Sequence, residues 1–233
     1  MLFRSNGIKI FGPDGFKLSD EQELELERLI LRPDFQNPLY DQIGEAKRIN
    51  DAAEQYSKHL VSCCPEGLDL KGMRIVLDCA HGAAYKLAPS ILRSLGAEVI
   101  LLGDAPNGLN INQEVGSLYP KAAQEAVTQQ KAHLGIVLDG DADRVVFIDE
   151  SGELISGDAV LALIAVHLRV NTLVSTEMSN LGLELCLAPH GIKVERTQVG
   201  DRYVVEKLRS ENHLFGGEES GHLIFMNRAT TGD

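Results

Sequence analysis

The chain of 233 residues carries 34 acidic and 22 basic side chains, which gives a formal net charge of −12 at pH 7. Its length allows about one to two domains with a real buried core, whereas its negative charge argues against a nucleic-acid partner, because phosphate backbones are bound by basic surfaces. The longest apolar run, 159–166, is too short to cross a bilayer, so we expect no membrane partner either.

The N-terminal part predicts a turn between two short strands over residues 7–18, followed by two helices. Ser19 and Gln22 form a capping-box pattern for the first helix, which we expect to run to about Leu31. The second helix is expected over 44–61, where apolar residues recur with the helical period.

The rest of the chain alternates strands with helices. Strands are expected at 73–77, 98–102, 134–138, 145–148, 172–175, 192–197, 214–215 and 223–226, and helices at 84–95, 121–131, 158–169, 181–188 and 203–208. This alternation predicts an α/β fold with helices layered on largely parallel sheets.

The most informative segment is the loop between two of these strands, where Asp139, Asp141 and Asp143 alternate with small residues and Arg144 follows. Hard divalent cations prefer oxygen ligands, and crowded carboxylates repel one another unless a cation joins them. Arg144 adds a planar fork suited to a phosphate or a carboxylate. The loop therefore predicts a metal-dependent reaction on a phosphate ester.

Two other interpretations of this loop compete with the catalytic one. The acidic residues and Glu150 match the ligand spacing of an EF-hand calcium loop, but Arg144 stands where that loop needs glycine, and the flanks resemble strands instead of helices. A solvated acidic turn is the second alternative.

A second polar loop, 216–222, follows a later strand. Its adjacent glycines free the backbone, Glu218 and Ser220 suit the hydroxyl groups of a polyol, and His222 suits an anion or a proton transfer. The competing interpretation is a glycine-rich turn with incidental polar residues. Ligand sites gather on loops held by a rigid scaffold, which favours the functional interpretation.

Three further positions are candidates with equally plain structural explanations. Lys9 is either an acid–base group or a solvated strand lysine. Segment 78–82 is best explained as a tight strand-to-helix turn, although a helix start there would also suit an anion. Asp201 and Arg202 either place charges near a substrate or simply begin a helix.

The four cysteines show no C-x-x-C spacing and lie within or beside apolar runs. Reduced thiols in a cytoplasmic protein are the expected consequence.

Taken together, the loop at 139–144 and the Gly-Glu-Glu-Ser-Gly-His loop at 217–222 resemble the α-D-phosphohexomutase superfamily, whose patterns are D-G-D-x-D-R and G-E-x-S-G-H about eighty residues apart. Other stretches are similar to its bacterial phosphoglucosamine mutase branch. They are 107–112 with 116–117, 178–182, 199–203 and 230–233.

The resemblance implies transfer of phosphate between the C6 and C1 oxygens of a phosphorylated hexosamine, through a phosphoserine and a bisphosphorylated sugar. It implies Mg²⁺ on the three aspartates of the loop, with Arg144 steadying the phosphoryl oxygens and Lys9 as the acid–base group. The implied substrate contacts are Glu218 and Ser220 on the sugar hydroxyls, His222 on the phosphate, and Asp201 and Arg202.

The resemblance also divides the chain into 1–63, the tail of a first domain with a linking helix; 64–156, a second domain with the metal loop; and 157–233, a truncated third domain with the sugar loop. It thus implies two consecutive αβα-layered domains with mixed, largely parallel sheets, preceded by the tail of a similar first domain.

Two parts of the family pattern are missing from this sequence. The family's S-H-N-P loop with the phosphorylated serine has no counterpart upstream of Asn6-Gly7-Ile8-Lys9, and Ser5 does not match it. The C-terminal phosphate-binding loop is also missing. We therefore expect a central fragment that is inactive alone, with a homodimer as the expected form of the full-length protein.

Three alternatives stay open at this point. One is a phosphomannomutase or phosphoglucomutase in place of the hexosamine enzyme. Another is a non-catalytic fragment that binds a sugar phosphate or a metal. The third is a metal-dependent phosphatase that uses one of the loop aspartates as nucleophile.

Overall fold

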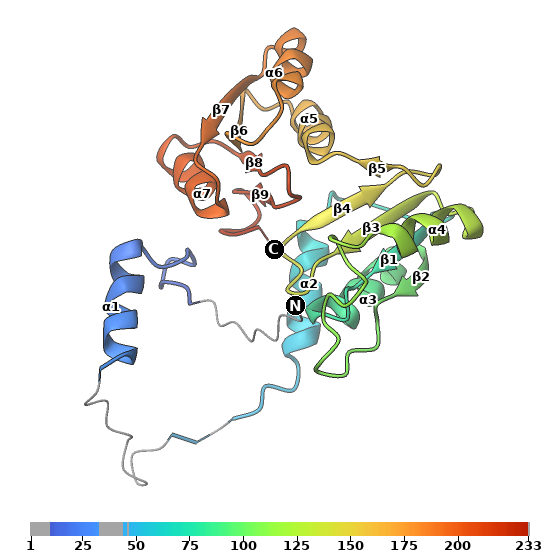
Figure 1. Ribbon diagram of the computed structural model, residues 1–233, viewed down its shortest axis with the longest axis horizontal. Coiled ribbons are helices and arrows are strands. Elements are labelled where there is room, and N and C mark those ends of the chain that lie inside the picture. Colours follow the sequence, from blue (N-terminus) through green and yellow to red (C-terminus); the bar gives the residue numbers. More distant parts are fainter. Residues whose placement is uncertain (1–9, 33–43, 46, 233) are drawn as a thin grey trace.

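The computed structural model describes residues 10–32, 44–45 and 47–232, which fold around two separate β-sheets (Figure 1). The first sheet has the strand order β2-β1-β3-β4-β5. Strand β1 is parallel to β2 and β3, whereas β4 is antiparallel to β3 and β5. Its strands are β1 (Arg74–Asp78), β2 (Glu98–Leu102), β3 (Leu134–Leu138), β4 (Val145–Ile148) and β5 (Leu154–Ile155).

The second sheet has the strand order β7-β6-β8-β9, with β6 parallel to both neighbours and β9 antiparallel to β8. Its strands are β6 (Thr172–Thr176), β7 (Lys193–Thr197), β8 (Phe215–Gly217) and β9 (Leu223–Phe225). The prediction of mixed sheets is confirmed. Strand β5 was not predicted, because two residues are too few to show an alternating pattern.

Helices cover both faces of the second sheet. Neighbouring residues of a strand point to opposite faces, and on β6 Leu173 packs in the cluster that contains α5 and α6, whereas Val174 packs against α7. In the first sheet α4 packs on β1 and β3, and α3 packs on β2. The helices are α3 (Leu87–Ser94), α4 (Lys121–Gln130), α5 (Gly157–Leu168), α6 (Leu181–Leu187) and α7 (Asp201–Ser210), with 3₁₀ turns at Ala83–Tyr85 and Ala188–His190.

The predicted N-terminal elements are partly confirmed. A single β-bridge joins Phe11 to Lys17 across the turn. Helix α1 (Asp20–Ile30) has the expected capping box, in which Ser19 accepts from the backbone of Gln22 and the Gln22 side chain accepts from the backbone of Ser19. Figure 1 shows α1 standing apart from both sheets, and none of its residues is buried.

The predicted start of the second helix is wrong. Helix α2 (Ala52–Cys63) begins well after Gly44, and Ile49, which the helical pattern had included, is 71% exposed and lies outside it. A helical turn is unfavourable to nucleate unless packing repays it. The described residues just before α2, 47–51, are all exposed, and Asp51 is of a residue type that favours the start of a helix.

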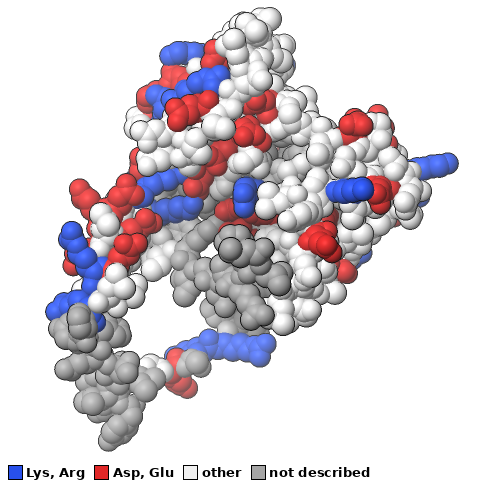
Figure 2. All heavy atoms as spheres, in the orientation of Figure 1, with Lys and Arg blue, Asp and Glu red and all other residues white. Residues whose placement is uncertain are grey.

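The described surface mixes both charge signs. In Figure 2, acidic and basic side chains alternate around β7 and along α1. Within the described ranges, no helix is long and apolar enough to cross a membrane.

Candidate active site

The acidic loop connects β3 to β4, two antiparallel strands, so the calcium-loop alternative with flanking helices is wrong. Ala142 adopts a left-handed conformation with φ of 64°. Carboxylate oxygens of Asp139, Asp141 and Asp143 lie within 4.8 Å of one another. Three hard oxygen donors at this spacing form a group that fits a divalent cation.

Asp139 is the buried member of this group, with 3% of the residue exposed, whereas Asp141 is exposed. Arg144 donates to its Oδ2 from Nε at 2.9 Å and lies 2.8 Å away through Nη2. Burial raises the pKa of Asp139, the Arg144 charge opposes that rise, and the neighbouring aspartates add to it. The buried carboxylate is thus held beside a cation, as an anion in a poorly solvated place requires.

The turn after β1 supports the acidic loop from behind. The amide of Ala83 donates to the carbonyl oxygen of Gly140 at 2.9 Å. A Cβ atom on Gly82 would lie only 2.1 Å from that oxygen. Asp78, fully buried, accepts from the amides of Ala80 and Gly116 and thereby fixes the turn. The turn itself was predicted from the sequence, but its contact with the acidic loop was not, because no local pattern reveals it.

The polar loop at 216–222, the predicted sugar loop, touches the strand that leaves the acidic loop. The amide of Val145 donates to the carbonyl oxygen of Gly221 at 3.0 Å. Within the loop, Glu218 and His222 close a tight turn through a 2.8 Å backbone hydrogen bond. The Ser220 residue is exposed, and the Glu218 carboxylate accepts from the amide of Gly200 at 3.0 Å. The fold therefore brings the two predicted loops together.

His222 and Asp201 also meet at this place. The His222 Nε2 atom lies 3.5 Å from Oδ2 of Asp201, which also accepts from Lys17 of the N-terminal hairpin. Burial acts to raise the pKa of Asp201, but the hydrogen bond and charge of Lys17, together with His222 and the amide of Arg202, outweigh it, so that this pKa lies below its ordinary value. A crevice of about 380 Å³ between the hairpin and α7 borders the Lys17–Asp201 pair.

Arg202 contacts the N-terminal segment and its own helix. It pairs with Asp20 and Glu23 near the start of α1 and with Glu206 on its own helix, and it donates to the carbonyl oxygen of Leu18. Its side chain is 18% exposed. Lys9, the expected acid–base group, lies outside the described residues.

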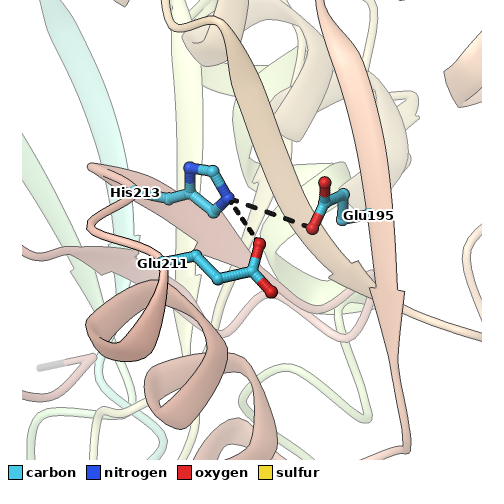
Figure 3. Close-up of side chains that lie close together, drawn as sticks. All are labelled: Glu195, Glu211 and His213. Atoms are coloured by element: carbon cyan, nitrogen blue, oxygen red, sulfur yellow. Dashed lines mark hydrogen bonds and ion pairs between the residues drawn. The ribbon is translucent and has the colours of Figure 1, made fainter.

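A second group of potential metal ligands lies at β7 and the C-terminal end of α7. Glu195, Glu211 and His213 approach one another in Figure 3. Lys207 Nζ already bridges the two carboxylates, 2.8 Å from Glu195 and 2.6 Å from Glu211, and Lys193 binds the other oxygen of Glu195. The Lys207 ammonium group therefore already neutralises these carboxylates, and we infer that the cluster stabilises the fold and does not bind a metal.

This cluster predicts a defined acid sensitivity. The hydrogen bonds from Lys193 and Lys207 lower the pKa of Glu195 from 4.5 to about 2. Because this pKa is lowered, the contribution of Glu195 to the free energy of unfolding is complete above pH 4.5 and is lost as the pH falls toward 2. We expect Glu195→Gln to lower the free energy of unfolding at neutral pH and to flatten its decline in that range, as measured by urea denaturation.

The matched control is Glu54→Gln, which breaks a 2.6 Å pair with Lys58 on the exposed face of α2. Exposed pairs contribute about 0–1 kcal/mol. An acid profile of Glu195→Gln parallel to that of the native chain would show that the cluster has no such role.

Comparison with known proteins gives the family. The family model described as phosphoglucomutase/phosphomannomutase, alpha/beta/alpha domain II, matches residues 54–152, and the model for domain III matches 156–233. The chain is 52% identical to a phosphoglucosamine mutase of Bdellovibrio bacteriovorus, covering 99% of this chain and 52% of that protein. It is 53% identical to one of Zymomonas mobilis, covering 99% and 53%.

Solved structures agree in fold. A putative phosphomannomutase from Thermus thermophilus superposes with a TM-score of 0.78 at 20% identity, over 94% of this chain and 51% of that one. A phosphoglucomutase/phosphomannomutase family protein from Burkholderia thailandensis gives 0.68 at 25% identity, over 78% and 40%. The chain spans about half the length of the curated relatives it matches. It belongs to the phosphoglucomutase/phosphomannomutase family, the α-D-phosphohexomutase superfamily that its two loops predicted.

Proposed function

We propose that this chain supplies the metal loop and the sugar loop of a phosphoglucosamine mutase, which interconverts glucosamine 6-phosphate and glucosamine 1-phosphate. The observation that carries the proposal is the backbone contact between the two loops, from the amide of Val145 to the carbonyl oxygen of Gly221. Relatives with that name, at 50–53% identity, favour the hexosamine over glucose or mannose.

The donor set at the acidic loop fits Mg²⁺, because one oxygen from each of three carboxylates lies within 4.8 Å of the others and the buried Asp139 is stabilised by the neighbouring Arg144. Asp139, Asp141 and Asp143 would hold the ion, which supplies neutralisation of phosphate charge when bound. Arg144 would then be available to orient phosphoryl oxygens through its planar fork.

The sugar loop would orient the substrate. Glu218 and Ser220 would accept and donate hydrogen bonds to the hydroxyl groups, and His222 would contact the phosphate. Lys9 is proposed as the acid–base group. Phosphoryl transfer depends on positioning and charge neutralisation more than on covalent chemistry by the protein, so these loops need the phosphoserine of the complete enzyme. We propose a cytoplasmic enzyme that forms a homodimer at full length and has no nucleic-acid or membrane partner.

The proposal predicts metal-dependent binding without turnover. We expect the 233-residue chain to bind glucosamine 6-phosphate in the presence of Mg²⁺, measured by ligand-detected NMR, and to make no glucosamine 1-phosphate. Asp139→Asn should weaken Mg²⁺ binding by at least about 10–100-fold in calorimetry, because it removes the charge of a proposed ligand and even changes to the outer groups that support a metal's ligands have effects of that size. Asp51→Asn, at the start of α2, is the matched control.

Other outcomes would favour the competing functions. Tighter binding of mannose 6-phosphate or glucose 6-phosphate would move the assignment to those sugars. Release of inorganic phosphate by the isolated chain, abolished by Asp139→Asn, would favour a phosphatase. Absence of any Mg²⁺-dependent binding of sugar phosphate would contradict the assignment of the two loops.

A further inference from the structure

We propose that Asp201 is a positioning residue, which fixes the imidazole of His222 from the start of α7, and that Lys17 holds the Asp201 carboxylate in place. The inference extends the proposed function, in which His222 contacts the substrate phosphate. It gives Asp201 a role different from the direct substrate contact expected from the sequence.

The first observation is the burial of the imidazole. His222 is 4% exposed, and its Nε2 atom is fully buried without a hydrogen bond from any described residue. Its polar neighbour is Oδ2 of Asp201, at 3.5 Å. A buried ring nitrogen without a partner is unfavourable, and a carboxylate only accepts hydrogen bonds. The arrangement therefore favours a proton on Nε2, donated toward Asp201.

The second observation is that the chain closes over this edge of the ring. A Cβ atom on Gly232 would lie 2.4 Å from Nε2 and 2.5 Å from Cδ2 of His222. The same C-terminal segment is tied to the hairpin, because Thr230 Oγ1 donates to the carbonyl oxygen of Gly15 at 2.5 Å. The Nε2 atom is buried under this backbone and is not exposed to a ligand. Nε2 thus serves a contact within the protein, and Nδ1 is the nitrogen left for the substrate, where it can donate to a phosphate oxygen only in the imidazolium form, which carries a proton on both nitrogens.

The third observation is that Lys17 holds Asp201 and that the neighbouring Gly200 holds Glu218. Lys17 pairs with the same oxygen, Oδ2, that faces His222. The residue before it, Gly200, has a φ of 132° and donates its amide to the Glu218 carboxylate at 3.0 Å. Gly200 and Asp201, at the start of α7, therefore hold Glu218 and His222 respectively. Lys17, which is distant in sequence, pairs with the Asp201 carboxylate and keeps it in place.

The test is the tautomer of His222, read from long-range ¹H–¹⁵N spectra of the labelled full chain at alkaline pH, where a neutral ring carries one proton. The His222 signals are assigned by their loss in His222→Gln. We expect a proton on Nε2 that exchanges slowly with water. In Asp201→Ala the exchange should become about tenfold faster, as for loss of one hydrogen bond, whereas Asp201→Asn, which keeps an acceptor oxygen, should preserve the slow proton.

Glu206→Ala is the matched control, since it removes another carboxylate of α7, the partner of Arg202. It should leave the His222 signals unchanged. In Lys17→Met the Nε2 proton should exchange at a rate between the rates of the native chain and of Asp201→Ala. A proton on Nδ1 in the native chain, or an unchanged slow proton in a folded Asp201→Ala or in Lys17→Met, would overturn the inference. These readouts need no substrate, so they stand apart from any failure of glucosamine 6-phosphate binding.

Discussion

Gly221→Ala is expected to lower the free energy of unfolding by roughly 2–5 kcal/mol and to abolish binding of glucosamine 6-phosphate. Gly221 has a φ of 97°, and a left-handed backbone costs about 1–2 kcal/mol for a residue with a Cβ atom. That Cβ atom would also lie 2.1 Å from the carbonyl oxygen of Val145, and overpacking of this kind costs about 1–3 kcal/mol more. Relief of the clash separates the sugar loop from the metal loop.

The matched control is Gly67→Ala. Gly67 has a comparable φ of 74°, but nothing lies within 4 Å of the added Cβ atom. The Gly67→Ala variant should therefore lose only the cost of the left-handed backbone, about 1–2 kcal/mol of the free energy of unfolding, and it should still bind glucosamine 6-phosphate. Urea denaturation and ligand-detected NMR measure both effects. Equal losses in the two variants would mean that the contact with Val145 contributes nothing.

The second large effect is expected at the metal loop. Gly82→Ala places a Cβ atom 2.1 Å from the carbonyl oxygen of Gly140 and 2.7 Å from its Cα atom. Since Gly82 has a φ of −109°, an alanine there meets no left-handed strain, and the clash acts alone. We expect a loss of about 1–3 kcal/mol in stability and Mg²⁺ binding weaker by about 10–100-fold, because groups that support a metal site tune its affinity by that much.

Gly44→Ala serves as the control for this variant, since nothing lies within 4 Å of the Cβ atom it adds. It should change stability by no more than about 0.5 kcal/mol, as surface substitutions usually do. Calorimetric titration with Mg²⁺ compares the two variants. If Gly82→Ala folds and binds Mg²⁺ like the native chain, the turn after β1 does not hold the acidic loop.

Local patterns in the sequence predicted most of the elements. The capping box of Ser19 and Gln22 is confirmed because both of its hydrogen bonds join residues three apart. Strands β2, β3 and β4 have the predicted limits, since short apolar runs bounded by turn residues are encoded locally. The acidic loop was recognisable for the same reason, because its three carboxylates converge within one short stretch of chain.

Residues distant in sequence decided the rest. Helix α2 begins at Ala52, after a described stretch, 47–51, that is exposed throughout and therefore buries nothing to repay an earlier turn. Arg202, whose sequence neighbours suggested a substrate contact, pairs with the start of α1. The contacts of Gly221 with Val145 and of Gly82 with Gly140 join segments that no periodic pattern connects. The sequence by itself thus determined the chemistry that each loop offers, whereas the tertiary structure decided which loops meet, because close backbone approach depends on packing between distant strands.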